Sequence, residues 1–150
     1  MLLNKKGSVH AVIFVVVILV GFVVALGWPQ YRKNQTIRNA QQALEFGKKL
    51  AFLEASYKEA TGFYTPDFTE LTRAGGERFP CEYTRENRKL VCAHYSYYLE
   101  KGDLLIVRHN TFPNWFEVNI NKGSVACLHE ESSISGSHVC EQLGKKAFLN

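Results

Sequence analysis

Four cysteines are the residues of this 150-residue chain best placed to do chemistry, and they stand at positions 81, 92, 127 and 140. An even number of cysteines at short spacings in a small domain is typical of disulfides, which form in oxidising compartments. Cys81 and Cys92 lie symmetrically about residues 86–87, so a hairpin that turns there would bring their sulfur atoms together. Cys127 and Cys140 would then close a second loop, although four cysteines allow three pairings.

The second pair of cysteines also belongs to a mirrored set of zinc-ligand types, Cys127-x-His129 and His138-x-Cys140. Thiolates and imidazoles are common ligands of tetrahedral zinc, but the Cys-x-His spacing is not one of its common arrangements. We therefore predict disulfides, with zinc as the alternative, and expect no cofactor and no resident metal.

The other reactive residue types are not arranged for catalysis. Ser137 and His138 are sequence neighbours, which is not how a nucleophile and its base usually meet. No glycine-rich phosphate loop follows a predicted strand, and Glu130 and Glu131 are typical of a solvated acidic pair. We expect a protein that is not an enzyme.

An apolar run covers residues 9–28, ahead of all four cysteines. His10 is its only ionisable residue, and a helix of twenty residues spans roughly 30 Å, the thickness of a bilayer's hydrocarbon core. Trp28 and Tyr31 flank its far end, as interfacial aromatic residues often do. We predict a transmembrane helix. A secretory signal peptide and a buried core helix are the alternatives, but the run is long for a signal and lacks a following cleavage site.

The charges on either side of this run are nearly balanced, so the cysteines decide its orientation. Because all four follow the run, we place residues 30–150 outside the cytoplasm, as one globular domain. The net charge of +4 is small and the basic residues are scattered, so no nucleic-acid partner is predicted.

A helical pattern of apolar residues covers residues 34–60, and Thr61-Gly62 is a credible stop. Pro29 lies between this segment and the apolar run, where it would kink the helix without ending it. We predict one long, bent helix over residues 9–60 that packs one stripe of its second half on a sheet. That stripe comprises Ile37, Ala40, Leu44, Gly47 and Ala51, widened by Ala43, Leu50, Leu53 and Tyr57.

A connecting loop with a short helix near residues 67–73 is predicted next. The sequence that follows this loop has the pattern of β-strands. Alternating residues and turn signals predict three antiparallel hairpins, formed by residues 81–85 with 88–93, 95–100 with 103–109, and 115–120 with 124–128. The polar tail from residue 129 is expected to be a loop that returns to Cys140. Four aromatic residues either form a binding face or pack on the sheet: Tyr95, Tyr97, Tyr98 and Trp115.

Together these features resemble the type IV pilins and pseudopilins. Lys5-Lys6-Gly7 resembles the site that the prepilin peptidase recognises, with cleavage between Gly7 and Ser8. Pro29 would be residue 22 of the cleaved chain (29 − 7 = 22), where the family's helix-kinking proline falls. The segment from Cys127 to Cys140 resembles the C-terminal disulfide-bounded loop of many pilins.

The resemblance implies an α+β, pilin-like fold, with a long bent N-terminal helix on an antiparallel sheet and a disulfide-bounded C-terminal loop. It implies a leader at 1–7, a transmembrane and filament-core helix at 8–29, its amphipathic continuation at 30–62, a connecting loop at 63–80, and the sheet and C-terminal loop at 81–150.

The resemblance also implies a function as a minor or divergent pilin with a role in adhesion or motility. Its partners would be other pilin subunits, the prepilin peptidase, the inner-membrane assembly platform and, before assembly, membrane lipid. The precursor would cross the inner membrane once and then enter a surface pilus or a periplasmic pseudopilus. A type II secretion pseudopilin and an uncleaved, membrane-anchored extracytoplasmic binding protein are the alternatives.

The chain departs from the family's pattern at two residues. Val12 stands where the family has a glutamate, whose carboxylate is thought to meet a subunit's N-terminal amine inside the filament. Val12 cannot form this pair, which favours a tip-capping minor subunit, a subunit that incorporates poorly, or an anchored assembly factor. Ser8 stands where the family usually has phenylalanine, at the residue whose amine would be methylated.

Overall fold

The computed structural model describes residues 5–75, 79–86 and 88–147, which form two compact units that divide between Thr36 and Ile37. Residues 1–4 of the predicted leader and Asn87 of the predicted first turn lie outside the described residues. Each unit is described by itself.

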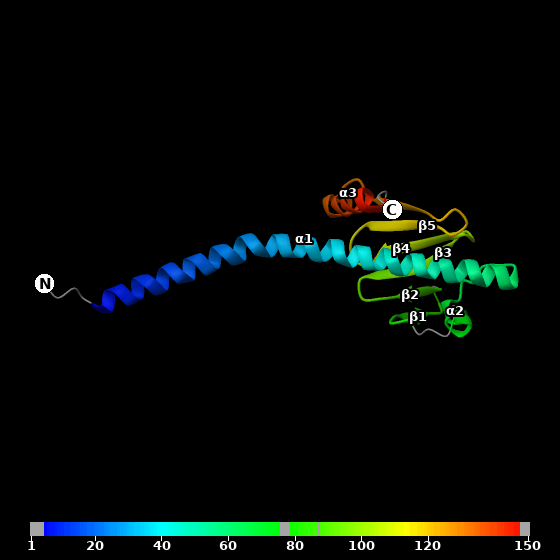
Figure 1. Cartoon of the computed structure of the whole chain (residues 1–150), viewed down its shortest axis with the longest axis horizontal. Helices are drawn as coiled ribbons and strands as arrows, with labels where there is room; N and C mark the ends of the chain where they lie inside the picture. Colours follow the sequence, from blue (N-terminus) through cyan, green and yellow to red (C-terminus); the bar gives the residue numbers. More distant parts are fainter. Residues whose placement is uncertain (1–4, 76–78, 87, 148–150) are drawn as a thin grey trace. The chain divides into compact units, whose positions relative to one another are not determined.

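The first helix, α1, covers Lys5–Thr61 without a break, so the predicted long helix is confirmed (Figure 1). Pro29 lies inside it, and the kink at this proline stays a prediction. The helix ends where expected, because Gly62 adopts a φ of +91° and its N–H donates to the carbonyl oxygen of Lys58 at 2.7 Å. A left-handed residue directly after the last turn is a common helix stop, and glycine adopts this conformation without a steric penalty.

Six antiparallel strands follow in sequence order across one sheet (Figure 1). They are β1 (Glu82–Thr84), β2 (Lys89–Val91), β3 (Tyr95–Glu100), β4 (Leu104–His109), β5 (Asn114–Asn119) and β6 (Ser124–His129). All three predicted hairpins are confirmed. Lys101 and Gly102 adopt positive φ values of 49° and 81° in the turn between β3 and β4, as the turn signal predicts.

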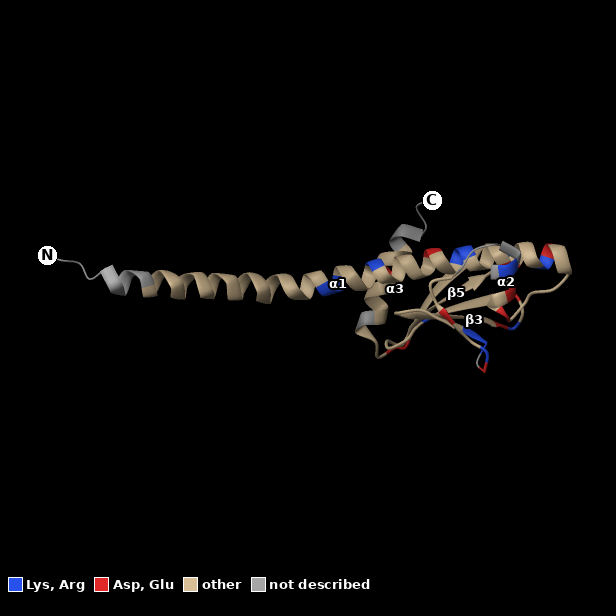
Figure 2. Ribbon diagram, turned by 90° about the horizontal axis from the view of Figure 1, so that it is seen from below, with Lys and Arg blue, Asp and Glu red and all other residues tan. Residues whose placement is uncertain are grey.

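The core lies between residues 37–61 of α1 and one face of the sheet, which Figure 2 shows as two layers. The predicted stripe is largely confirmed, with Ala40, Leu44, Leu50 and Ala51 buried. Gly47 makes the closest approach, since a Cβ atom there would lie 2.7 Å from Cγ2 of Val107 on β4. The sheet contributes alternate residues to this core: Leu90, Tyr95, Tyr97, Leu105, Val107, Phe116 and Val118.

The predicted short helix is present as α2, which covers Phe68–Gly75. Asp67 caps it, because its Oδ1 accepts a hydrogen bond from the backbone N–H of Thr69 at 2.9 Å. Phe68 and Leu71 are buried and fix α2 to the core.

The polar tail contains a third helix, α3 (Ile134–Ala147), where we expected only a loop, so this part of the prediction is wrong. Ser133 caps α3, as its Oγ accepts from the backbone N–H of Gly136 at 3.0 Å. Val139 and Leu143 are one turn apart and both buried, so burial of one apolar face overrides the weak helix propensity of the serine and glycine residues.

Candidate functional site: the apolar half of the first helix

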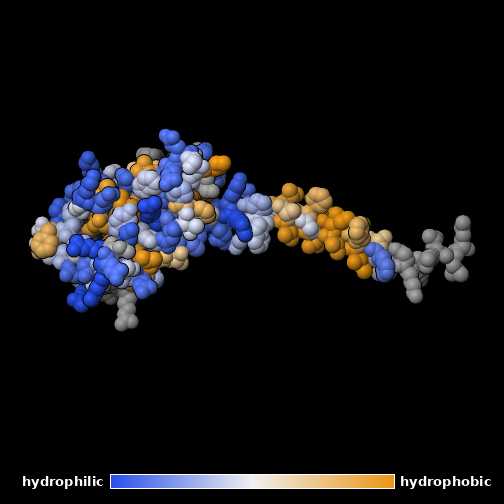
Figure 3. Space-filling model, turned by 180° about the vertical axis from the view of Figure 1, so that it is seen from behind, coloured by the Kyte–Doolittle hydropathy of each residue, from blue (hydrophilic) through white to orange (hydrophobic). Residues whose placement is uncertain are grey.

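Residues 11–29, in the N-terminal half of α1, are apolar on every side of the helix. Residues 10–31 include no lysine, arginine, aspartate or glutamate, and Figure 3 shows this stretch as a hydrophobic rod. All of these residues are exposed in the single chain, with Val23 71% and Leu26 75% exposed. A helix that is apolar all round is normally covered by lipid or by other helices. By length and composition, it is the one helix among the described residues that could cross a membrane.

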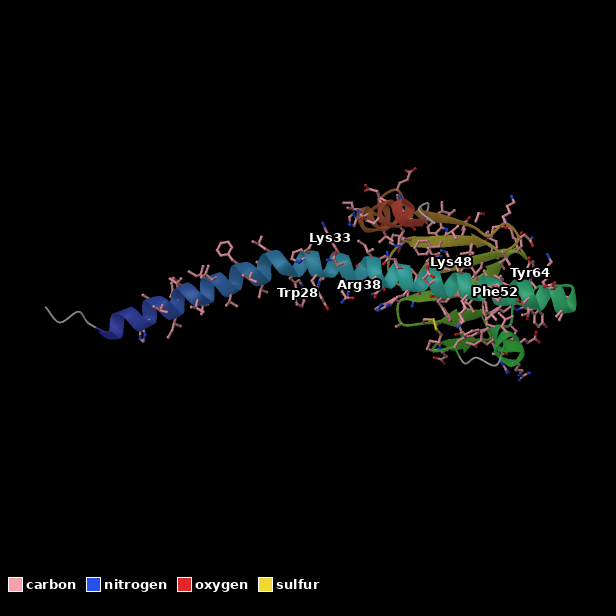
Figure 4. All side chains as sticks on the ribbon, viewed as in Figure 1. Trp28, Lys33, Arg38, Lys48, Phe52 and Tyr64 are labelled. Atoms are coloured by element: carbon pink, nitrogen blue, oxygen red, sulfur yellow. A yellow bond between two sulfur atoms is a disulfide. The ribbon has the colours of Figure 1, made fainter. Side chains whose placement is uncertain are left out.

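Aromatic and basic residues mark the end of the apolar stretch, where Trp28 and Lys33 are labelled in Figure 4. The guanidinium carbon of Arg32 lies 5.4 Å from the centre of the Trp28 ring, within cation–π range. Tyr31 accepts a hydrogen bond at its hydroxyl oxygen from Nε2 of Gln35 at 2.8 Å. Such rings with polar tips suit the boundary between hydrocarbon and water.

The predicted processing site lies at the start of the same helix. Gly7 and Ser8 fall within the first turns of α1, directly after Lys5 and Lys6. Val12 is 59% exposed, one turn beyond Ser8. A carboxylate at position 12 would therefore face whatever surrounds the helix rather than the chain's own core.

Both predicted disulfides are confirmed, and Figure 4 draws disulfide sulfur in yellow. Cys81 and Cys92 extend the register of the β1–β2 hairpin, with a Cα–Cα distance of 4.5 Å. Cys127 on β6 is joined to Cys140 on α3, with a Cα–Cα distance of 5.4 Å. The second bond therefore ties α3 to the edge strand, and it removes the two thiolates that the zinc alternative needs.

The structure divides the four aromatic residues between the two faces of the sheet. Tyr95 and Tyr97 are buried toward α1, and the Tyr97 hydroxyl donates to the carbonyl oxygen of Ala43 at 3.3 Å. Burial raises the pKa of Tyr95 to about 12. Tyr98 and Trp115 lie half-buried on the opposite face. The packing interpretation holds for the first two residues, and the second two remain available for binding.

A buried carboxylate is the residue that sequence reasoning missed. Glu54 is completely buried in α1, where its Oε2 accepts from the backbone N–H of Thr65 at 3.1 Å and its Oε1 has no hydrogen-bond partner. Burial, and to a lesser degree the charge of Glu70, raise the pKa of Glu54 to about 7. Glu54 lies beside the predicted apolar stripe, but its burial depends on where the connecting loop with Thr65 packs. The sequence pattern does not give the position of that loop.

Comparison with protein-family models, curated proteins and solved structures found no match. The long apolar N-terminal helix and the antiparallel sheet with its two disulfides are compatible with a pilin-like architecture.

Proposed function

We propose that this chain is a structural subunit of a type IV pilus, a minor or divergent pilin. The observation that carries the proposal is α1, one continuous helix whose residues 11–29 are exposed and apolar on all sides, while its later turns form the core under the sheet. A filament subunit needs this combination because its helix is first surrounded by lipid and then by the helices of other subunits.

The mechanism is mechanical. The apolar half of α1 holds the precursor in the inner membrane, with residues 30–150 outside the cytoplasm. The prepilin peptidase removes residues 1–7 by cleaving between Gly7 and Ser8. The assembly platform then moves the helix out of the bilayer, so that contacts with lipid are replaced by contacts with other pilin subunits. The sheet unit faces outward and offers its surface for adhesion.

Two alternatives are kept because particular residues favour them. A type II secretion pseudopilin would use the same helix and the same processing, but the Cys127–Cys140 bond favours a pilus. An uncleaved membrane-anchored binding protein is favoured by Val12 and Ser8, the two departures from the pilin pattern.

The decisive experiment is to purify the protein from native cells and to measure its intact mass and its N-terminal residue. We expect the chain to begin at Ser8, with or without a methylated amine. A Gly7→Leu variant should keep its leader, whereas a matched Gly21→Leu variant should be cleaved normally. Gly21 is far from the bond, and a Cβ atom added to it would have no neighbour within 4 Å.

A native chain that begins at Met1 would contradict the filament proposal and support the uncleaved anchor. If the chain begins at Ser8, its presence in filaments sheared from the cell surface separates a pilus subunit from a pseudopilin. Absence from sheared filaments, together with loss of secretion in a deletion strain, would favour the pseudopilin.

A further inference from the structure

The face of the sheet turned away from α1 carries two neighbouring hollows, and Figure 3 shows that this side is mainly hydrophilic. One hollow has a volume of about 350 Å³ and the other of about 280 Å³, so together they fall within the range of small-ligand sites. Tyr98 and Arg108 line both of them, so the two hollows adjoin. The register sets Arg108 directly opposite Trp115, which places both side chains on this face.

The larger hollow is basic. Lys89 and Arg108 line it, and among the described residues no aspartate or glutamate does so. Lys89 has its Nζ atom 4.7 Å from the centre of the Tyr98 ring, and neither cation forms an ion pair with any described residue. Two cations in a hollow that no described aspartate or glutamate lines suit a carboxylate ligand, although one of them, Arg108, also borders the acidic residues of the smaller hollow.

Hydrogen bonds within the protein hold several of the residues that line this hollow. Ser96 donates from Oγ to Oδ1 of Asn110 at 2.5 Å, and Nδ2 of Asn110 donates to the carbonyl oxygen of Cys92 at 2.9 Å. The loop after β4 folds around His109, whose Nδ1 accepts from the backbone N–H of Phe112 at 2.9 Å. Burial lowers the pKa of His109, which keeps Nδ1 free to accept. The site is therefore formed before a ligand arrives.

The smaller hollow is more acidic. Beside the shared Tyr98 and Arg108, it is lined by three carboxylates, from Glu100, Glu117 and Glu130, and by the indole of Trp115. Trp115 donates from Nε1 to Oε1 of Glu117 at 3.3 Å, which holds the ring beside the acid. Carboxylates accept hydrogen bonds from neutral hydroxyl groups, and an indole packs against the apolar face of a ligand.

We infer that this face of the sheet binds an acidic oligosaccharide, with a carboxylate-bearing sugar in the basic hollow and a neutral sugar in the acidic one. Lys89 and Arg108 pair with the sugar carboxylate, while Glu117 and Trp115 bind the hydroxyls and the ring of the neutral sugar. A polyanion with a charge on every unit, such as a nucleic acid, would place negative charge against three glutamates. The inference is independent of whether residues 1–7 are removed.

The test uses the full chain in detergent, with its tryptophans labelled with ¹⁵N. The chain has two tryptophans, so the spectrum contains two indole N–H signals, and Trp28 on α1 serves as an internal control for Trp115. Titration with sialyllactose, or with a glucuronic-acid disaccharide that ends in a neutral sugar, should shift the Trp115 signal and leave that of Trp28 in place. Both ligands should bind at least about tenfold more tightly than lactose, which lacks the carboxylate.

A Lys89→Gln variant should weaken binding of the acidic sugars about tenfold and leave the weak binding of lactose unchanged, because Lys89 lines only the basic hollow. The matched control is Lys33→Gln, since Lys33 is an exposed lysine on α1 (Figure 4) and lines neither hollow. Equal affinity for lactose and the acidic sugars would overturn the inference, and so would the absence of any shift at Trp115. Tighter binding of polysialic acid, which has a carboxylate on every unit, would also overturn it.

Discussion

Glu54 is an ionisable residue in the protein interior, where a charge is energetically costly. The side chain is completely buried, and only one of its two carboxylate oxygens has a hydrogen-bond partner. Burial raises the pKa of Glu54 from 4.5 to about 7, so the folded protein binds a proton that the unfolded chain has already lost near neutral pH. The contribution of this group to stability is fully present below pH 4.5 and is lost as the pH rises to about 7.

We predict that the unfolding free energy falls by roughly 3 kcal/mol from this group as the pH rises through that window. Glu54→Gln should remove most of this dependence and raise the melting temperature at pH 8, because the amide carries no charge. Thermal unfolding at pH 5 and pH 8 provides the measurement. The exposed Glu45→Gln variant should keep the wild-type dependence, and an unchanged pH dependence in Glu54→Gln would show that another group is responsible.

Val12 presents the converse case, an apolar residue where the proposed function would use a charge. If the chain is a pilin, Val12→Glu should increase its proportion in sheared filaments several-fold, because the carboxylate offsets the cost of an N-terminal amine in a medium of low dielectric. Val16→Glu is the control, since Val16 is also exposed on the same apolar helix but lies about one turn further on. Equal yields of both variants would mean that no subunit amine reaches position 12.

At the scale of elements, the packing of α1 on β4 depends on the absence of one side chain. Gly47→Ala would place a Cβ atom 2.7 Å from Cγ2 of Val107, a completely buried and β-branched residue that has no room to move. Overpacking costs about 1–3 kcal/mol, which exceeds the gain of up to about 1 kcal/mol in helix propensity. We expect a net loss of about 1 kcal/mol in urea unfolding.

Gly144→Ala is the matched control for this prediction. Gly144 lies in α3 with open space around its Cβ position, so the alanine variant should be neutral or stabilised by up to about 1 kcal/mol. A loss of stability in both variants would point to a general effect of the substitution, not to the contact with Val107.

The elements also show which features can be read from sequence. The hairpins followed from alternating residues and turn signals, and the Cys81–Cys92 bond followed from its symmetry about one turn, because these features are local. The helix α3 could not be predicted in this way, since among its described residues the buried hydrophobic side chains are those of Val139 and Leu143. The burial of Glu54 and the two hollows depend on how distant segments meet, which local patterns do not contain.

At the scale of the whole molecule, residues 37–150 form a compact unit with a core of their own. We predict that a chain starting at residue 33, secreted into an oxidising compartment, is soluble without detergent and unfolds in one cooperative transition. Circular dichroism during heating tests this expectation. Val118→Asp, which puts a charge into the buried core, should abolish the transition, whereas aggregation of the unaltered fragment would contradict the prediction.

Every strand of the sheet pairs with its neighbour in the chain, the first cysteine is bonded to the second, and the third is bonded to the fourth. If the segment beyond α1 crosses a membrane from its N-terminal side, each hairpin can close as soon as its second strand emerges. The first cysteine then meets its correct partner before the third is exposed. Oxidation in the order of emergence therefore gives the native pairs directly, so maturation should proceed without a disulfide isomerase.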